Sequence, residues 1–587
     1  MPKTHSRSGA EAMTFVGTTI AATILATRFC VFAQTHPPHM AKDEAHYPFV
    51  YGVASGSPLP DGVMIWTYVE SSAPAETLSW EVAEDENFSV VAARGTVVAT
   101  ESTGRTAKAD VRGLAPGKRY YYRFEDASGR RSVVGRTQTA PAGAVAALRF
   151  GVVSCSSVYS GYFNAYRKLS QRNDLDALIH LGDYIYDFVD EDEKVFVPEP
   201  FPQVPQTLSE WRNRHAYYLL DPDLRAARQN LPWIMLWDNH DLNADSPDDG
   251  ARAFWEWNPV RMPDSSDARR IYRSYAFGDL ADVVILDALL HRPAPGDDTL
   301  SILGETQFDW FRRTLLASTA RWRVIGNQKL VSSLSAPALP GFEGDVSPWG
   351  LYPGGRERFG RALRARNNNI LVGGDAHIGF ANDFADSTYR LDDKTGAYAP
   401  EFLPNSVSRG NVDEQVGSLF GSPEQINRLG RDLIYPENPH VRYMDLVSHG
   451  YGILDVRRDS AKAEFWHCPI LEISEEQNLA ATAVVYAGTR HWNATHSPTQ
   501  RPTLELPPIL TVYPNPARDK AFLRTNIGGV KTFRVVCAAD GKIVACGAFA
   551  GQIAPLNAGA LAEGLYFAFV GREGAYATAK FCVLRNR

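Results

Sequence analysis

Leu178-Ile-His-Leu-Gly-Asp-Tyr-Ile-Tyr-Asp187 is the stretch that decides the fold, because a short apolar run there ends at a glycine and leads into polar side chains. The apolar run predicts a buried strand, and Gly182 permits a sharp turn at the end of that strand. Asp183 and Tyr186 then offer two oxygen atoms three residues apart, which suits a hard cation. A capping aspartate beside a packed tyrosine is the simpler explanation of this motif alone, so a metal site requires partners at other strand ends.

A β-α-β unit surrounds this strand. The segment from Leu148 to Val153 predicts a buried strand, and the segment from Tyr162 to Gln171 has helical character. Parallel strands joined by a helix present their carboxyl ends at the same edge of the sheet. We therefore expect Cys155, which follows the first strand, to share an edge with Asp183.

Two later predicted strands are also followed by side chains that can bind metals. The strand Trp233 to Trp237 leads into Asp238-Asn-His-Asp241, and the strand Ile370 to Gly374 leads into Asp375-Ala-His377. Further strands and helices alternate between them, which predicts a layered α/β domain over residues 146–470.

The predicted strand ends carry side chains that commonly bind metals: Cys155, Asp183, Tyr186, Asn239, His240, Asp375 and His377. Taken singly, each has an ordinary structural explanation, since a lone buried cysteine is usually inert and an asparagine after an aspartate usually caps a helix. Taken together, thiolate, carboxylate, amide, phenol and imidazole groups at one rim predict a site for two metal ions.

The donor types divide this set between two metals. The softer or more strongly donating side chains are those of Cys155, Tyr186 and His377. They favour a transition metal, and a thiolate with a phenolate indicates ferric iron. Asn239 and Asp375 are harder or neutral donors that suit calcium, magnesium, manganese or zinc, and Asp183 would bridge both ions.

Such a pair of cations predicts phosphate ester hydrolysis. Two cations about 4 Å apart can clamp a phosphoryl group, lower the pKa of a bridging water and offset charge on the leaving oxygen. The nucleophile would be a metal-bound hydroxide, and His240 would be the general acid for the leaving alcohol.

The composition is that of a globular protein with several domains. Of 587 residues, 44% are apolar and 22% are charged, and the length suggests three or four domains. A net charge of -7 and a pI near 6.1 give no basic surface, so we expect no stable complex with nucleic acid.

Residues 1–33 predict a secretory signal peptide, because Lys3 and Arg7 precede a mostly apolar run from Met13 to Ala26. Arg28 interrupts the apolar character, so a non-cleaved anchor is the alternative. No later segment has the length and apolar character of a transmembrane span.

The cysteines do not form a disulfide framework. An exported chain permits disulfides, but the six cysteines are spread along the whole sequence. We expect at most one bridge, joining Cys537 to Cys546 or to Cys582.

Short predicted strands separated by turn-forming residues indicate a β-sandwich before the central domain and another after it. The first covers residues 45–142, where Leu114-Ala-Pro-Gly-Lys-Arg-Tyr120 resembles the corner before a late strand of fibronectin-type modules. The second covers residues 509–587, after a linker over 471–508. We expect structural rather than catalytic roles for both.

The sequence from Phe49 to His467 resembles the alkaline phosphatase D (PhoD-like) phosphatases and phosphodiesterases, within the wider calcineurin-like metallophosphoesterases. The resemblance rests on a set of motifs in a fixed order. They are Gly52-Val-Ala-Ser-Gly-Ser-Pro-Leu-Pro-Asp-Gly62 with Ile65-Trp-Thr67, Ser154-Cys155, Gly161-Tyr-Phe163, His180-Leu-Gly-Asp-Tyr-Ile-Tyr186, Trp237-Asp-Asn-His-Asp241, Gly374-Asp-Ala-His377 and Ser448-His-Gly-Tyr451.

This resemblance implies a core of two mixed sheets flanked by helices, with the first sandwich as the family's companion domain. It also implies a centre of iron (Fe3+) and calcium (Ca2+). Asp183 and Tyr186 match the family's Gly-Asp-x-x-Tyr, and Cys155 matches the cysteine that replaces the first Asp-x-His motif of the superfamily. Asn239 and His240 match its Asn-His pair.

A further analogy divides the ligands of the last motif, Gly374-Asp-Ala-His377, between the two metals. Purple acid phosphatases share Gly-Asp-x-x-Tyr with this family. The analogy assigns His377 to the iron side and Asp375 to the other metal.

The chain departs from the family pattern at two strand ends. The family often has Leu-Asp-Thr-Arg where this chain has Leu286-Asp-Ala-Leu289, so an arginine is missing. Arg292 could replace it as a phosphate contact, with a solvated surface arginine as the alternative. Asn327 or Gln328 stands where related enzymes place another metal-binding histidine, which suggests a ligand or a supporting contact.

Residues 509–587 resemble the type IX secretion sorting domain. The matching segments are Val512-Tyr-Pro-Asn-Pro-Ala517, Asp519, Asp540-Gly-Lys542 and Gly564-Leu-Tyr566. The resemblance implies export to the periplasm, then passage across the outer membrane by the type IX secretion machinery, with release or attachment at the cell surface.

The sequence as a whole predicts a secreted, monomeric alkaline phosphatase that hydrolyses small phosphomonoesters and, as an open possibility, diesters. A phosphodiesterase acting on teichoic-acid-like, phospholipid or nucleic-acid-derived substrates is the first alternative, and no residue decides between the two. A surface adhesin with an inactive centre is the remote alternative, which the intact ligand set opposes.

Overall fold

The computed structural model describes residues 39–189, 204–243, 246–262, 267–335, 337, 344–416, 422–496, 510–513, 515–525, 531–538, 542–551, 553–572 and 575–584. The predicted signal peptide, residues 1–33, lies outside these ranges, and so does the part of the predicted linker from 497 to 508. None of the helices in these ranges combines the length and apolar character that a bilayer span requires.

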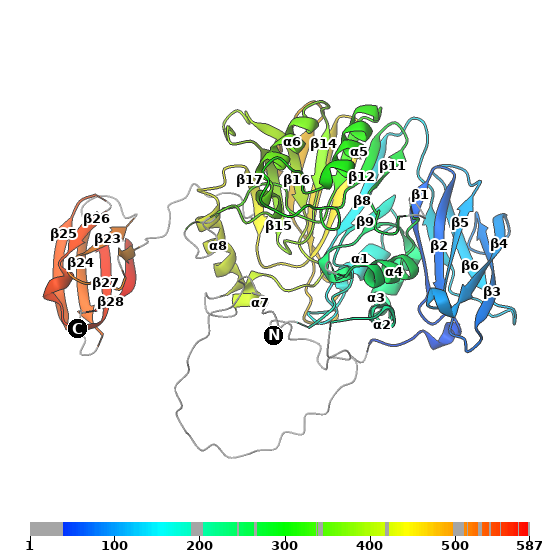
Figure 1. Ribbon diagram of the computed structural model, residues 1–587, viewed down its shortest axis with the longest axis horizontal. Helices are drawn as coiled ribbons and strands as arrows, with labels where there is room; N and C mark the ends of the chain where they lie inside the picture. Colours follow the sequence, from blue (N-terminus) through cyan, green and yellow to red (C-terminus); the bar gives the residue numbers. More distant parts are fainter. Residues whose placement is uncertain are drawn as a thin grey trace, which may run out of the picture.

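Two large sheets packed face to face form the centre of the molecule (Figure 1). The first has the strand order β21 (Ala494–His496), β20 (Asn478–Tyr486), β19 (Ser460–His467), β18 (Gly450–Arg457), β8 (Ala147–Val153), β9 (Ala177–Leu181), β10 (Pro232–Leu236), β1 (Val53–Leu59), β2 (Gly62–Tyr68) and β5 (Thr106–Arg112). The second has the order β11 (Arg273–Phe277), β12 (Ala281–Ile285), β13 (Trp322–Gly326), β14 (Asn369–Val372), β16 (Ala397–Leu403), β15 (Gly379–Ala385) and β17 (Val441–Asp445).

Apolar side chains from both sheets form one core. Phe150 of β8 makes an edge-to-face contact with Phe277 of β11, with ring centroids 5.0 Å apart. Gly151, the next residue along β8, lies close to Leu169 of a covering helix. The central strands are thus buried on both faces, which explains their almost continuous apolar sequences.

Helices cover the outer faces of the pair. Those packed along the ten-stranded sheet are α1 (Asn164–Ser170), α2 (Leu208–Tyr218), α3 (Pro222–Asn230) and α4 (Asp248–Trp257). The seven-stranded sheet is covered by α5 (Gly304–Ala317) and α6 (Pro353–Leu363), through a second apolar cluster that includes Phe311 and Phe359. The remaining helices are η1 (Glu44–His46), η2 (Glu101–Thr103), η3 (Asn239–Asp241), η4 (Pro348–Leu351), α7 (Val412–Val416), α8 (Pro423–Ile434) and η6 (Ala558–Ala560).

The N-terminal sandwich is continuous with the central sheet. Its outer sheet has the order β4 (Val91–Thr100), β3 (Ala75–Ala83), β6 (Arg119–Glu125) and β7 (Gly135–Gln138). Its inner sheet consists of β1, β2 and β5, and β1 pairs in parallel with β10. The hydroxyl of Tyr120 accepts a hydrogen bond from the backbone N–H of Ala115 at 2.9 Å, which is the corner contact that the sequence suggested.

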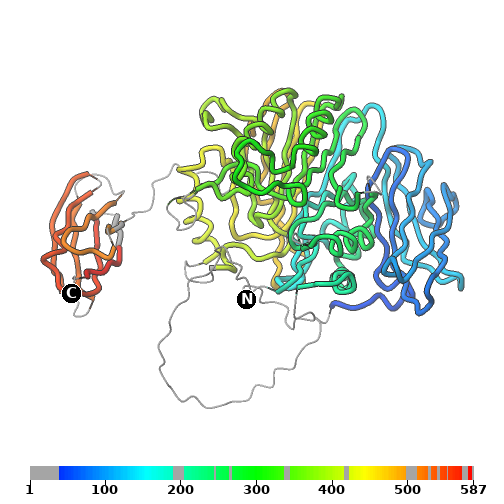
Figure 2. Tube along the Cα trace, viewed as in Figure 1, coloured from blue at the N-terminus to red at the C-terminus, as the bar shows by residue number. Residues whose placement is uncertain are grey.

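The C-terminal strands form a separate small sandwich with its own apolar core (Figure 2). One sheet consists of β22 (Leu510–Tyr513), β23 (Ala521–Thr525) and β26 (Ile553–Leu556), and the other of β25 (Ile543–Phe549), β24 (Lys531–Cys537), β27 (Gly564–Arg572) and β28 (Ala575–Val583). The expected disulfide is wrong, because Cys537, Cys546 and Cys582 are all free. Cys537 and Cys582 lie on strands that are not neighbours, and Cys546 is exposed on β25.

Candidate metal centre

The carboxyl ends of five strands meet at one edge of the paired sheets. In the first sheet β8, β9 and β10 run parallel, and in the second β13 runs parallel to β14. Backbone hydrogen bonds join the loops that follow, since the amides of Cys155 and Ser156 donate to the carbonyls of Gly182 and Asp183 at 3.2 and 2.9 Å. The predicted convergence of loops after β8 and β9 is therefore present.

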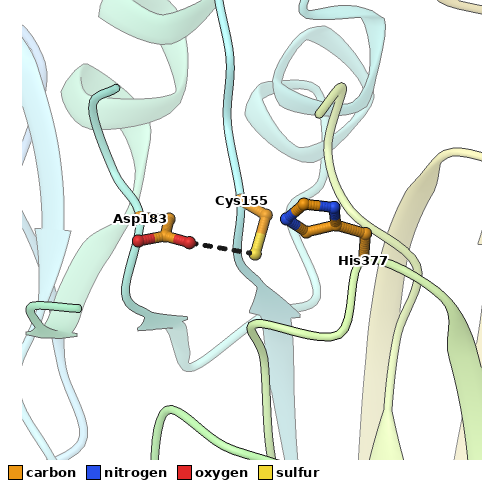
Figure 3. Close-up of side chains that lie close together, drawn as sticks. All are labelled: Cys155, Asp183 and His377. Carbon is orange, nitrogen blue, oxygen red and sulfur yellow. Dashed lines mark hydrogen bonds between the residues drawn. The ribbon is translucent and has the colours of Figure 1, made fainter. Parts of the chain in front are cut away.

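Cys155, Asp183, Tyr186 and His377 form a compact group, buried except at the half-buried His377, which we name the sulfur subsite. Figure 3 shows the Cys155 thiol between the Asp183 carboxylate and the His377 imidazole. The thiol lies 3.7 Å from Asp183 Oδ2, and the Tyr186 hydroxyl lies 3.4 Å from the same oxygen and 3.3 Å from His377 Nε2. One ligand atom each from Cys155, Asp183 and His377 lie within 4.8 Å of one another, a spacing that fits a metal ion.

Hydrogen bonds outside the sulfur subsite fix the orientation of its members. His377 Nδ1 lies 3.0 Å from the carbonyl oxygen of Gly410 and so donates to it, which leaves the Nε2 lone pair directed into the subsite. The backbone amide of Tyr186 donates to the Tyr218 hydroxyl at 2.8 Å, and its carbonyl accepts from buried Arg214 at 3.0 Å.

Unusual backbone geometry accompanies these side chains. Of the nine non-glycine residues with positive φ in the described part of the chain, four are candidate ligands: Cys155 (59°), Asp183 (52°), Asp375 (62°) and His377 (61°). Such residues are rare and concentrate where the fold imposes a conformation for function. A Cβ on Gly374 would lie 2.8 Å from Ser154 Cβ, so only glycine lets the loop after β14 approach the loop after β8 this closely.

Asp183, Asp238, Asn239 and Asp375 form a second group, which we name the oxygen subsite. Carboxylate oxygens of its three aspartates lie within 4.8 Å of one another, so this group also fits a cation. Lys329 lies against it, with Nζ 2.7 Å from Asp238 Oδ2 and 2.5 Å from Asp375 Oδ1. The two subsites share Asp183.

The electrostatics of the two subsites differ. Burial raises the pKa of the Cys155 thiol and of the Tyr186 phenol, and the charge of Asp183 adds to both shifts. Burial lowers the pKa of His377 to about 4. Burial also lowers the pKa of Lys329, but the carboxylates of Asp238 and Asp375 outweigh it, so the pKa of that ammonium is raised.

His240 lies beside both subsites. Its ring stacks on Tyr186 with centroids 4.3 Å apart, and its backbone amide donates to Asp183 Oδ1 at 3.2 Å. Its Nδ1 lies 2.7 Å from Asp187 Oδ1. Burial lowers the pKa of His240, but Asp183 and Asp187 outweigh that effect and raise the pKa to about 9.

The other predicted residues make contacts away from these atoms. Asn327 accepts a hydrogen bond from the backbone amide of Lys329 at 3.0 Å, and Gln328 donates to the carbonyl of Trp237 at 2.9 Å. Asn327 thus supports the backbone of Lys329, and Gln328 supports the residue directly before Asp238. Arg292 is exposed and acts on Tyr352, whose phenol pKa it lowers against the larger raising effect of burial.

Several contributors were not assigned from the sequence. Asp238 and Lys329 follow the ends of β10 and β13 by two and three residues, so the strand-end rule could have placed each near its own strand end, but not the contact between them. Asp187 lies four residues beyond Asp183. Arg409 lies in the loop after β16, with its guanidinium 5.5 Å from the Tyr186 ring centroid, and nothing in the local sequence pattern indicates that position.

Two packed mixed sheets that bring these donors to a shared edge form a fold of the metallophosphoesterase type. A family model described as "PhoD-like phosphatase" matches residues 150–465, and another described as "PhoD-like phosphatase, N-terminal domain" matches residues 34–141. Alkaline phosphatase D of Bacillus subtilis (strain 168) is 30% identical in an alignment of 483 residues, and the match covers 73% of this chain and 79% of that protein. The chain belongs to the PhoD-like phosphatase family and is a phosphoric ester hydrolase.

Solved structures agree with the fold class predicted from the sequence. A structure of PhoD has a TM-score of 0.67 and 27% identity, and the match covers 79% of this chain and 95% of that one. Purple acid phosphatase PPD1 from yellow lupin (Lupinus luteus) seeds has a TM-score of 0.51 and 13% identity, with 78% and 77% covered. The second likeness concerns the fold alone.

Proposed function

We propose that this chain hydrolyses phosphomonoesters at a dinuclear metal centre, with Fe3+ in the sulfur subsite and Ca2+ in the oxygen subsite. One observation carries the proposal: two largely buried donor groups of different chemistry share the buried Asp183 at the joined strand ends. Thiol, phenol and imidazole suit iron, whereas carboxylate and amide oxygens suit calcium, with magnesium, manganese or zinc as the other candidates for that subsite.

The residues of the chain hold and orient the reacting groups. When bound, such metal ions activate a water molecule and offset the negative charge of the phosphoryl group. His377 is held by Gly410 with Nε2 facing the subsite, and Asp183 directs one carboxylate oxygen toward the thiol and the other toward the His240 amide. Arg409 adds a fixed positive charge beside Tyr186, which favours an anionic substrate at this edge.

His240 is proposed as the general acid for the leaving alcohol. The Asp187 carboxylate holds Nδ1, so Nε2 is the ring nitrogen left to face the leaving oxygen. The Asp187 carboxylate, hydrogen-bonded to Nδ1, raises the pKa of the imidazole and so favours the protonated form, which can donate a proton.

Paired chromogenic substrates test the reaction class. The protein, purified without chelators and supplied in turn with Ca2+, Mg2+, Mn2+ or Zn2+, should hydrolyse p-nitrophenyl phosphate faster than bis-p-nitrophenyl phosphate. A preference for the diester would replace phosphomonoesterase by phosphodiesterase. Absence of hydrolysis of both dyes with every cation would refute the enzyme assignment.

We also propose that the protein is exported through the type IX secretion machinery and works as a monomer in the medium or at the cell surface. Support comes from the apolar run in residues 13–26 and from the C-terminal sandwich, whose core contains none of the candidate ligands. Deleting residues 509–587 should retain the enzyme in the periplasm with its activity intact. Secretion unchanged by that deletion would contradict the sorting role.

A further inference from the structure

Lys329 lies within the oxygen subsite although its sequence position was assigned no role. It follows β13, which belongs to the second large sheet, and it is 5% exposed. Its Nζ lies 2.7 Å from Asp238 Oδ2, 3.1 Å from Asn239 Oδ1 and 2.5 Å from Asp375 Oδ1. One ammonium group therefore contacts three of the four members of the oxygen subsite.

The turn that carries Lys329 is anchored to the loops that carry these partners. The Asn327 carboxamide accepts from the Lys329 amide at 3.0 Å, and the Gln328 carbonyl accepts from the Gly374 amide at 2.9 Å. The Gln328 side chain donates to the Trp237 carbonyl at 2.9 Å, directly before Asp238. These contacts direct the lysine side chain toward the oxygen subsite and define supporting roles for Asn327 and Gln328.

An ammonium in this position and a directly coordinated metal need the same oxygen atoms. Carboxylates at this spacing, with Asp183 and Asp238 buried and Asp375 half-buried, require a cation, and without a metal the lysine supplies it. A divalent ion entering the subsite meets that fixed positive charge within a few ångströms, where repulsion in a buried environment is strong. Within the described part of the chain, Lys329 makes no hydrogen bond or ion pair with Cys155, Tyr186 or His377, so it does not compete for the thiol, phenol and imidazole of the sulfur subsite.

We propose that Lys329 is a resident cation that competes with the second metal ion, so that the oxygen subsite binds divalent cations weakly and reversibly while the sulfur subsite retains its metal. This inference rests on the proposed two-metal function, since it concerns how the second ion enters. The ammonium has to leave Asp238 and Asp375 when that ion binds.

Calcium titration without substrate tests the competition. Lys329→Met keeps the length of the side chain and removes its charge. Calorimetric titration with CaCl2 should show binding at least about tenfold tighter in K329M than in the wild type, because the competing charge is gone. The iron content of the two proteins, measured by mass spectrometry, should be equal.

Lys168→Met is the matched control. Lys168 is also largely buried and pairs with a carboxylate, Glu475, which belongs to neither subsite. K168M should bind Ca2+ with the wild-type affinity. A gain in K168M equal to that in K329M would show a general effect of lost charge and overturn the proposal.

The unfolding temperature is a second measurement, which tests the proposal even if K329M folds poorly without metal. Added Ca2+ should raise the unfolding temperature of K329M and of K329Q more than that of the wild type, since tighter binding to the folded state stabilises it more. Equal shifts, equal affinities, or no Ca2+ binding by any of the proteins would each refute the resident-cation role. Failure of the dye assay alone would refute only the proposed function, because these titrations contain no substrate.

Discussion

The sulfur subsite and the oxygen subsite share Asp183 but balance its charge in different ways. In the sulfur subsite, burial raises the pKa of the thiol and phenol and lowers that of the imidazole, so each of these donors is neutral before a metal binds. In the oxygen subsite, burial raises the pKa of Asp238, while Lys329 lowers the pKa of Asp375 against the effect of burial. The thiol, phenol and imidazole of the sulfur subsite are thus neutral before a metal binds, whereas the oxygen subsite already contains a cation.

This difference gives each subsite its own expected response to metal. Binding at the sulfur subsite must displace protons from the thiol and phenol, which ties that metal to deprotonation and to soft, strongly donating ligands. Binding at the oxygen subsite must displace an ammonium group. Variants that affect one subsite alone, both, or neither can therefore test the comparison.

Removing the shared ligand should have the largest effect. Asp183→Ala takes away a carboxylate from both donor groups, so both metals should be lost and activity should fall at least about 10⁴-fold, equivalent to the several kcal/mol that metal ions contribute. Metal content and p-nitrophenyl phosphate hydrolysis measure the two losses. Asp174→Ala, which removes a partly exposed carboxylate paired with Arg172, is the control. Normal metal content in D183A would show that the subsites are independent.

Removing the thiol or the phenol should affect only the sulfur subsite. Cys155→Ala and Tyr186→Phe should weaken iron binding by about 10²-fold or more, because each removes a donor that the subsite cannot replace. Charge transfer from phenolate to iron should colour the wild type, and Y186F should lack that absorption band. Calcium binding should persist in both variants.

Tyr184→Phe is the matched control for Y186F. Its hydroxyl lies 2.8 Å from Arg228 and outside both subsites, so Y184F should keep both the colour and the iron. A colourless wild type that still hydrolyses phosphate esters with zinc or manganese would exclude iron but leave the fold and reaction intact.

His240→Asn should leave the metals in place and slow the chemistry. We expect a loss of at least about 10²-fold with alkyl phosphates, whose poor leaving groups need a proton. The loss with p-nitrophenyl phosphate should be much smaller. Asp187→Asn, which weakens the hold on Nδ1, should show the same substrate dependence at lower amplitude. Equal losses on both kinds of substrate would exclude proton donation by His240.

Asp238→Asn should weaken calcium binding at the oxygen subsite without affecting the sulfur subsite, whereas K329M should strengthen calcium binding. Loss of one negative charge should reduce calcium affinity by about tenfold, while iron content stays unchanged. Calorimetric titration with CaCl2 measures the change. Tighter calcium binding in D238N would mean that Asp238 acts as the ion-pair partner of Lys329 and is not a ligand of the metal.

The strand ends of the centre were predictable because they depend on local sequence. A buried apolar run followed by Gly182 or Gly374 and a polar residue marks where a strand stops, and parallel pairing brings such ends together. The same logic missed Asp238, since the neighbouring Asn239 and His240 already had roles in the matched motif.

Contacts between distant segments were not predictable. Lys329 meets Asn239 across 90 residues of sequence, and that contact exists only because the edges of two sheets come together. Arg409 lies in an irregular loop without periodic pattern. The pairing of β1 with β10 was missed for a related reason, because the side-chain pattern of a strand does not reveal which strand lies beside it.

A buried histidine outside both subsites should affect acid stability but not metal content. Neither ring nitrogen of His215 has a hydrogen-bond partner among the described residues, and burial, reinforced by Arg228, lowers its pKa to about 3. The unfolded chain protonates this histidine below about pH 6.5, whereas the folded chain does not, so folding stability falls as pH decreases through that range. By pH 4 the loss is roughly 3 kcal/mol.

His215→Phe should therefore flatten the decline in unfolding free energy between pH 7 and pH 4, measured by urea unfolding, with normal iron and calcium binding. His496→Phe, at an exposed position, should leave the decline unchanged. Loss of metal from H215F would extend the centre beyond the two subsites and weaken the contrast between them.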